Sequence, residues 1–334
     1  MAEFDDHTPL TTGAASAGTV VAEQKLPLEE ISVTRARLRL FWRGMKTNVA
    51  LFAENPIGLV GIAIIVFYAL LALAHPILMK TAWTPNIYHP VTGVDLSVEF
   101  NPAPPSATHL LGTDPLGRDI LSQLMFSTRS AFVLGLLAAL VTVFIATSVG
   151  AVSAYYGGVV DTIFMRMADL IIMTPTVTIL IVLGALFDLG MVELAIVIGI
   201  LSGFGGAVII IKSQALTVKV RTYIEAARVA GGSNAHIIFR HIIPNLLPLS
   251  FLYMMFTVSA AIAIEAVLSF FGLLNIRMSW GLMIHTTEYS GYFLDIKKWW
   301  LIFPASLSIS FLSAAFYLVG RALDEIVNPR LRKR

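Results

Sequence analysis

The sequence predicts an all-α, polytopic membrane protein with six transmembrane helices. Of its 334 residues, 57% are hydrophobic and only 13% are charged, and the mean hydropathy is +0.79. A soluble domain carries roughly 25% charged residues. The chain also contains six long apolar runs, and in lipid such runs satisfy their backbone groups only as helices. It has no cysteine, which excludes disulfides and thiol catalysis.

The N-terminal region contains two predicted segments. Residues 1–28 are rich in Thr, Ala, Gly and Ser without apolar periodicity, which predicts a disordered tail. No signal peptide is expected, because the first apolar run begins too late. Residues 29–50 predict an amphipathic elbow helix at the membrane surface, since Arg35, Arg39 and Arg43 share one helical face.

The six spans are each close to the ~20 residues that a helix needs to cross a bilayer. They are predicted at 56–78 (in a segment 51–78), 131–155, 170–187, 192–211, 249–271 and 299–319. With both termini in the cytosol, 17 of the 23 Lys and Arg residues lie on the cytoplasmic side, as the positive-inside rule requires. We therefore expect a multi-pass protein of the cytoplasmic membrane. An extracytoplasmic loop should cover 79–130, followed by a core over 131–330 and a basic tail over 331–334.

A polar segment at 212–247 separates the fourth span from the fifth, and the orientation above places it in the cytosol. We expect a short helix over 218–230 that Gly231 ends, because glycine enters the left-handed C-cap conformation without steric cost. Ser233 or Asn234 then caps a second helix, which should stop by Pro244.

This polar segment carries a run of motif residues: Glu225, Ala226, Ala227, Arg228, Gly231 and Pro244. At this spacing they resemble the EAA loop of binding-protein-dependent ABC importer permeases. The resemblance implies a type I permease fold, in which the loop is a cytoplasmic coupling helix that docks on an ATPase subunit. His241 and Ile243 depart mildly from the usual Ile and Leu. The alternative is an ordinary amphipathic loop.

The outer loop carries a second motif: Gly112, Thr113, Asp114, Gly117, Arg118 and Asp119. Two glycines around Asp114 predict a tight turn, and the two aspartates beside Arg118 predict an internal salt bridge. The motif resembles that of the C-type permeases of dipeptide, oligopeptide and nickel importers, from which Gln123 and Ser127 depart. Two roles are open for this motif. It is part of the outer face where the solute-binding protein docks or the substrate enters, or it is a structural turn that orients the second span.

Five more residues are candidates for structural or gating roles: Asp161, Arg166, Asp169, Pro175 and Glu265. The first three resemble a turn of the same family, and Arg166 and Asp169 can pair on one helical face. Pro175 should kink the third span. Glu265 lies deep in the fifth span, where a carboxylate is a functional candidate by default. We favour structure or gating over substrate contact for Glu265.

The resemblance covers roughly residues 50–330 and implies one membrane subunit of an ATP-driven importer, foremost of di- or oligopeptides. It implies a homologous second permease, two ABC ATPase subunits that bind ATP and Mg, an extracytoplasmic solute-binding protein, and membrane lipid, but no nucleic acid. The chain has no glycine-rich phosphate loop, so we expect no cofactor, no metal site and no catalysis in it.

Two alternatives stay open at this stage. The same machinery imports oligosaccharides or nickel in related systems. A stand-alone secondary transporter is the alternative of another class, and the lack of inverted repeats argues against it.

Overall fold

The computed structural model describes residues 49–327. The predicted tail at 1–28, all but the last two residues of the elbow helix at 29–50, and the basic tail at 331–334 lie outside the described residues.

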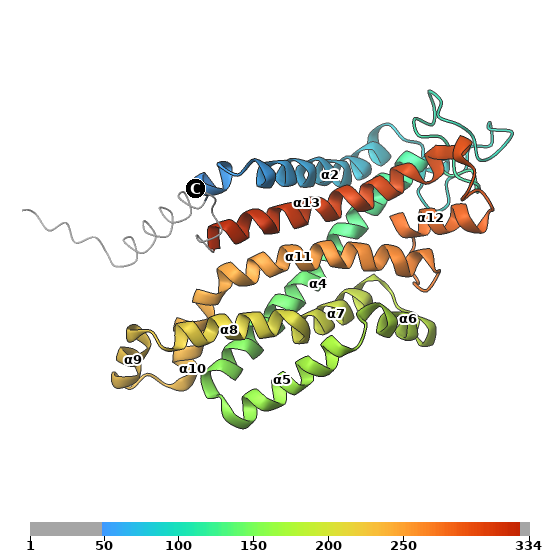
Figure 1. Cartoon of the computed structure of the whole chain (residues 1–334). Helices are drawn as coiled ribbons and strands as arrows, with labels where there is room; N and C mark the ends of the chain where they lie inside the picture. Colours follow the sequence, from blue (N-terminus) through green and yellow to red (C-terminus); the bar gives the residue numbers. More distant parts are fainter. Residues whose placement is uncertain (1–48, 328–334) are drawn as a thin grey trace, which may run out of the picture. The chain divides into compact units, whose positions relative to one another are not determined.

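The described part of the chain is helical and has no strand, which confirms the all-α prediction (Figure 1). Five helices are long and apolar enough to cross a membrane. They are α2 (Pro56–Thr81), α4 (Ile120–Tyr156), the continuous α7–η1–α8 (Met191–Lys219), the continuous α10–η2–α11 (Asn234–Phe270) and α13 (Phe303–Val327). The number rises to six if the bent pair α5 (Gly158–Met173) and α6 (Thr176–Leu186) forms one span.

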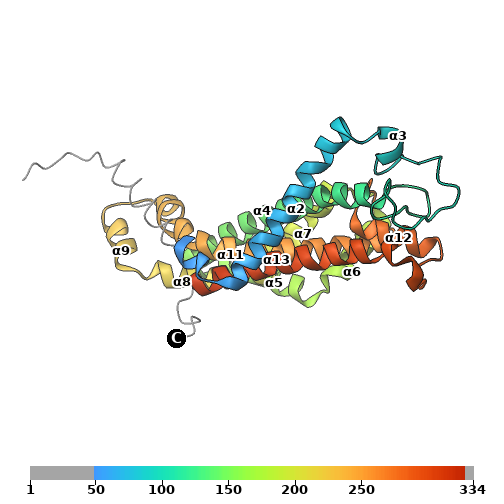
Figure 2. The same ribbon diagram turned by 90° about the horizontal axis from the view of Figure 1, so that it is seen from above.

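Short elements join these helices at the two ends of the bundle. They are α3 (Pro85–Tyr88), α9 (Thr222–Val229), α12 (Trp280–Tyr289) and the 3-10 turn η3 (Ile296–Leu301). In both views α9 lies at one end of the bundle, whereas α3 and α12 lie at the other (Figures 1 and 2).

The second span begins earlier than expected. We predicted its start at residue 131, but α4 begins at Ile120, where the Asp119 carboxylate accepts a hydrogen bond from Ser122 N–H at 2.7 Å. The first turns of α4 carry buried polar residues such as Gln123 and Thr128, so an apolar window misses them. The outer loop is correspondingly shorter than the predicted 79–130.

The third span is broken at Pro175, where we expected a kink. The axes of α5 and α6 differ by 81° across this point. Thr174 is extended, with ψ at 124°, because a residue that precedes proline is sterically driven out of the helical region. Proline therefore separates two helices rather than bending one.

The second helix of the polar segment, which begins at Asn234, does not stop by Pro244, contrary to our prediction. Residues Ile238–Ile242 form a π-helical turn, and Pro244 lies in the first positions of α11 that follow. A proline is tolerated there because the first helical N–H groups need no partner within the helix. The segment that enters the bundle is therefore continuous from Asn234 to Phe270.

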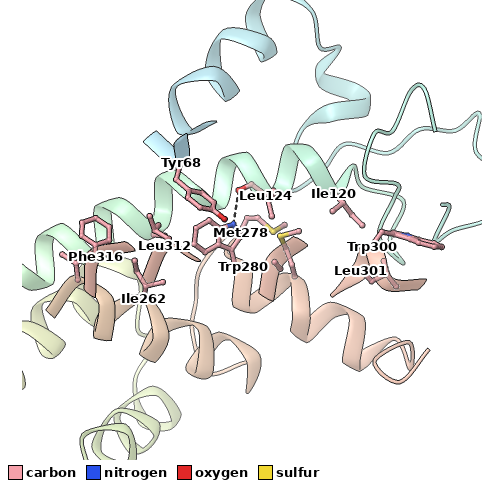
Figure 3. Close-up of a cluster of buried hydrophobic side chains, with 14 of the residues drawn as sticks. Tyr68, Ile120, Leu124, Ile262, Met278, Trp280, Trp300, Leu301, Leu312 and Phe316 are labelled. Atoms are coloured by element: carbon pink, nitrogen blue, oxygen red, sulfur yellow. Dashed lines mark hydrogen bonds between the residues drawn. The ribbon is translucent and has the colours of Figure 1, made fainter. Parts of the chain in front are cut away.

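The bundle is organised around α4, which packs against α2, α7, α8 and α11. At one end, side chains from five helices form a buried cluster that includes Tyr68, Leu124, Ile262, Trp280 and Phe316 (Figure 3). There the Trp280 indole donates a hydrogen bond to the Leu124 carbonyl at 3.1 Å. A second buried cluster lies around the opposite end of α4 and includes Tyr155, Ile211 and Ile224.

Candidate functional site

The motif helix α9 is shorter than the predicted helix over 218–230. The preceding helix α8 ends at Lys219, Arg221 is extended, and α9 begins at Thr222. The break falls among the β-branched residues Val218, Val220 and Thr222, whose stiff side chains lower helix propensity. The break turns α9 away from the axis of α8, so that it forms a separate element (Figure 1).

Gly231 ends α9 in the way the sequence predicts. Its φ is +83°, and its N–H donates to the Arg228 carbonyl at 3.0 Å. The N–H of Gly232 donates to the Ala227 carbonyl at 2.9 Å. These two bonds form a Schellman cap, which needs a left-handed residue at the position of Gly231.

One face of α9 is anchored and the other is free. Ile224 is fully buried in the cluster around the end of α4. Glu225, Ala226 and Arg228 are exposed, and Val229 is 90% exposed. The structure therefore presents a small, flat surface on α9 that a partner can approach, held in place from beneath by one isoleucine.

Hydrogen bonds also tie the region around α9 to the end of α4. The Tyr155 hydroxyl donates to Asn234 Oδ1 at 2.7 Å, and Lys219 Nζ donates to the Ala154 carbonyl at 2.9 Å. Ser233, rather than Asn234, caps α10, because its hydroxyl accepts from His236 N–H at 3.2 Å. Pro244 is exposed at the junction with α11.

Two contacts in this region could not be predicted from the sequence: the ion pair between Asp161 and Lys212, and the hydrogen bond between Tyr155 and Asn234. Asp161 on α5 forms an ion pair with Lys212 on α8 at 2.5 Å, which joins two neighbouring helices. Tyr155 gave no signal beyond its place before two glycines. Arg166 and Asp169 pair as expected, at 3.4 Å, but both side chains are exposed, and such pairs contribute little to stability.

The outer motif is a buried, closed turn. Arg118 forms the expected salt bridge with Asp114, at 2.6 Å, and Gln123 Nε2 donates to the same carboxylate at 3.0 Å. Gly112 and Gly117 adopt positive φ values of 77° and 82°. Thr113 is fully buried. Most of the motif thus points into the protein and not toward a partner.

Asp119 does not pair with Arg118, contrary to our prediction. It caps α4 and contacts His109, whose Nδ1 lies 2.8 Å from Asp119 Oδ2 and whose Nε2 lies 3.2 Å from Asp95 Oδ2. Hydrogen bonds from the Ser97 hydroxyl and N–H lower the pKa of Asp95, whereas burial raises the pKa of Asp119. A buried histidine between two aspartates therefore fastens the loop to the start of α4.

Glu265 lies apart from both motifs. It is buried in α11 and accepts a hydrogen bond from Ser269 Oγ at 2.5 Å, and Ser279 Oγ donates to Ser269 Oγ at 3.1 Å. Since Ser279 caps α12, the carboxylate belongs to a hydrogen-bonded link between α11 and α12. No group of three or more His, Asp or Glu side chains within residues 49–327 is arranged to hold a metal ion.

Comparison with known proteins identifies the family of this chain. Residues 146–333 match the family described as binding-protein-dependent transport system inner membrane component. The dipeptide transport system permease protein DppC of Bacillus subtilis is 30% identical over 298 residues, which cover 87% of this chain and 85% of that protein. The oligopeptide transport system permease protein OppC of the same organism is 31% identical over 285 residues, 84% of this chain and 88% of the relative.

A third relative is the glutathione transport system permease protein GsiD of Pectobacterium atrosepticum, 32% identical over 230 residues, 68% of this chain and 75% of that protein. The family match covers more than half of the chain, and the first two relatives cover most of it. The chain therefore belongs to the family of inner membrane components of binding-protein-dependent transport systems, the permease subunits of ABC importers.

Proposed function

We propose that this permease imports di- or oligopeptides and that α9 is its contact with the ATPase subunits. The cargo proposal is supported by the names of the relatives, which specify dipeptides, oligopeptides and glutathione, a peptide of another kind. The observation that carries the coupling proposal is the exposed surface of α9 on a helix that is anchored through Ile224.

The anchoring explains how force from a partner would reach the bundle. Since Ile224 is packed among side chains of α4, α8 and α11, a displacement of α9 must displace the ends of these helices. Packed elements of this kind move as rigid bodies between discrete arrangements. ATP and Mg are bound by the partner ATPase subunits, where hydrolysis also occurs. The nucleotide shifts the equilibrium between the two states of the transporter only by its differential affinity for them.

For the outer motif we propose a positioning role. Asp114, Arg118 and Asp119 are at least nine-tenths buried, so their polar atoms hold the turn and the start of α4. Exposed side chains of the same region, such as Leu116 and Phe100, offer the contact surface for an extracytoplasmic solute-binding protein. We also propose that α9 and both termini lie on the cytosolic side, and the charge bias of the sequence supports this orientation.

The complete assembly would contain a homologous second permease, two ATPases and the binding protein. The test is gentle purification of the chain from its native membrane, identification of partners and trapped solutes by mass spectrometry, and reconstitution in liposomes. ATP-dependent uptake of dipeptides with these partners supports the proposal. Uptake of an oligosaccharide or nickel instead would refute the cargo, and uptake by the chain alone without ATP would refute the importer.

A further inference from the structure

A cleft of about 440 Å³ lies between the α5–α6 break, the π-helical turn η1 (Gly203–Ala207) and α11. Its lining includes Ile172, Thr176, Ser202, Gly205, Tyr253 and Thr257. The volume falls within the roughly 300–1,000 Å³ that is typical of small-molecule sites. The cleft contains no residue of α9 or of the outer motif.

Two irregular stretches of backbone border this one cleft. Gly205 has non-helical angles, φ −80° and ψ −136°, and lies midway along the apolar helix Met191–Lys219. The second stretch is the break at Pro175, beside Thr176. At membrane depth, irregular backbone is tolerated only where it is buried in protein or lines a water-filled cavity. Gly205 itself is buried, but the next residue, Gly206, is exposed and also lines the cleft. A Cβ at Gly206 would meet no atom within 4 Å, so this side of the irregular turn borders the open space of the cleft.

The chemistry of the lining is polar but uncharged. It contains no Asp, Glu, Lys, Arg or His. The hydroxyl groups of Thr176, Ser202 and Tyr253 have no hydrogen-bond partner among the residues that the structure describes. A hydroxyl both donates and accepts, so these groups can bind the N–H and the C=O of a peptide unit. A nickel or other transition-metal ion would need imidazole, thiolate or carboxylate ligands, and the lining has none of them.

We infer that this cleft is a wet, uncharged section of the cargo passage, in which the hydroxyls of Thr176, Ser202 and Tyr253 bind the amide groups of a peptide. The inference rests on the proposed function and adds the cargo contacts to it. Because the lining carries no fixed charge, the cleft does not discriminate between cargo side chains of opposite charge. Selection by charge then falls to the solute-binding protein.

The absence of cysteine in the chain allows a direct test, since one introduced thiol reports on one position. Ser202→Cys and Thr176→Cys place thiols in the cleft. Ser310→Cys is a matched control on an exposed face of the apolar helix α13, outside the cleft. The probe is 2-sulfonatoethyl methanethiosulfonate, which is charged and does not cross membranes. The thiolate forms a mixed disulfide with it and releases methanesulfinate.

The reaction is followed on the complete transporter in lipid nanodiscs, both nucleotide-free and trapped with ATP and vanadate. A thiol in lipid stays protonated, so we expect the cleft thiols to react at least about 10-fold faster than Ser310→Cys in one of the two states. Dialanine at its dissociation constant should slow this reaction about twofold, because half of the sites are then occupied. Maltose at the same concentration should leave the rate unchanged.

The outcomes separate this inference from the proposed function. If the transporter assembles and hydrolyses ATP, yet both cleft thiols react as slowly as Ser310→Cys in both states, the cleft is dry and the inference is wrong while the function stands. Protection by maltose but not by dialanine overturns the peptide chemistry of the site. If the unlabelled chain fails to assemble with ATPases, both proposals fall. Two cleft positions guard against a single variant that does not fold.

Discussion

The Tyr155 hydroxyl donates to Asn234 Oδ1 at 2.7 Å and so joins the last turn of α4 to the first residue of α10. Together with the hydrogen bond from Lys219 Nζ to the Ala154 carbonyl, this bond ties the helices on both sides of α9 to α4. It predicts that Tyr155→Phe, which keeps the ring but removes the donor, loosens the connection between α9 and α4. The expected cost is about 1 kcal/mol in free energy of unfolding, with fewer peptides imported per ATP hydrolysed.

Tyr156→Phe is the matched control for this bond, because Tyr156 is 52% exposed whereas Tyr155 is 9% exposed. Thermal unfolding of the purified transporter and the ratio of uptake to ATP hydrolysis measure the two effects. Equal ratios for the two variants would show that the bond has no part in coupling.

Gly231→Ala tests the cap of α9. The φ of +83° is strained for alanine although no atom would lie within 4 Å of the new Cβ, so the effect is conformational and not steric. We expect a loss of about 1 kcal/mol in stability and weaker coupling. Gly231→Asn should recover part of both losses, since asparagine tolerates the left-handed region better. If alanine and asparagine behave alike, the cap conformation is not the cause.

Glu225→Lys tests the exposed surface of α9. Glu225 is exposed, so the substitution should leave the melting temperature of the isolated chain within the small range typical of surface changes. Reversal of its charge should nevertheless reduce ATPase retention during purification and ATP-dependent uptake. Glu225→Gln, which keeps the shape, should have the smaller effect. Normal uptake by Glu225→Lys with both ATPases bound would refute the coupling role.

Arg118→Ala tests the outer turn. The substitution leaves the buried Asp114 carboxylate without its cation, and breaking a buried ion pair typically costs about 3–5 kcal/mol. Arg277→Ala removes a charge from an exposed outer position and serves as the control. We expect a lower melting temperature for Arg118→Ala alone, with lower uptake as a consequence. Equal stability of the two variants would contradict the positioning role.

The features that the sequence predicted correctly depend on neighbours along the chain. Apolar runs located the spans, Gly231 located the end of α9, and the ion pairs Arg118–Asp114 and Arg166–Asp169 join residues four and three positions apart. Periodicity and short spacing contain this information because helix geometry brings such residues together.

The features that could not be predicted from the sequence depend on tertiary contacts. Tyr155 and Asn234 are 79 positions apart, and Asp161 meets Lys212 only because α5 packs near α8. The start of α4 was misplaced because buried Gln123 and Thr128 look like loop residues until their partners are known. The uncharged cleft gave no signal either, since its lining comes from three separate stretches of chain.

The helix α4 is unbroken, unlike the bent pair α5–α6 and the helix that contains the irregular turn η1. It runs for 37 residues without an internal proline, so at 1.5 Å per residue it is a rod of about 55 Å. Asp119 fixes one end and Tyr155 holds the other. A tilt of about 5° about one end of such a lever would move the other by about 5 Å, close to the rise of one helical turn. Substitutions in the turn around Arg118, at the start of α4, should therefore yield suppressors of coupling defects in α9, which packs against the end of α4.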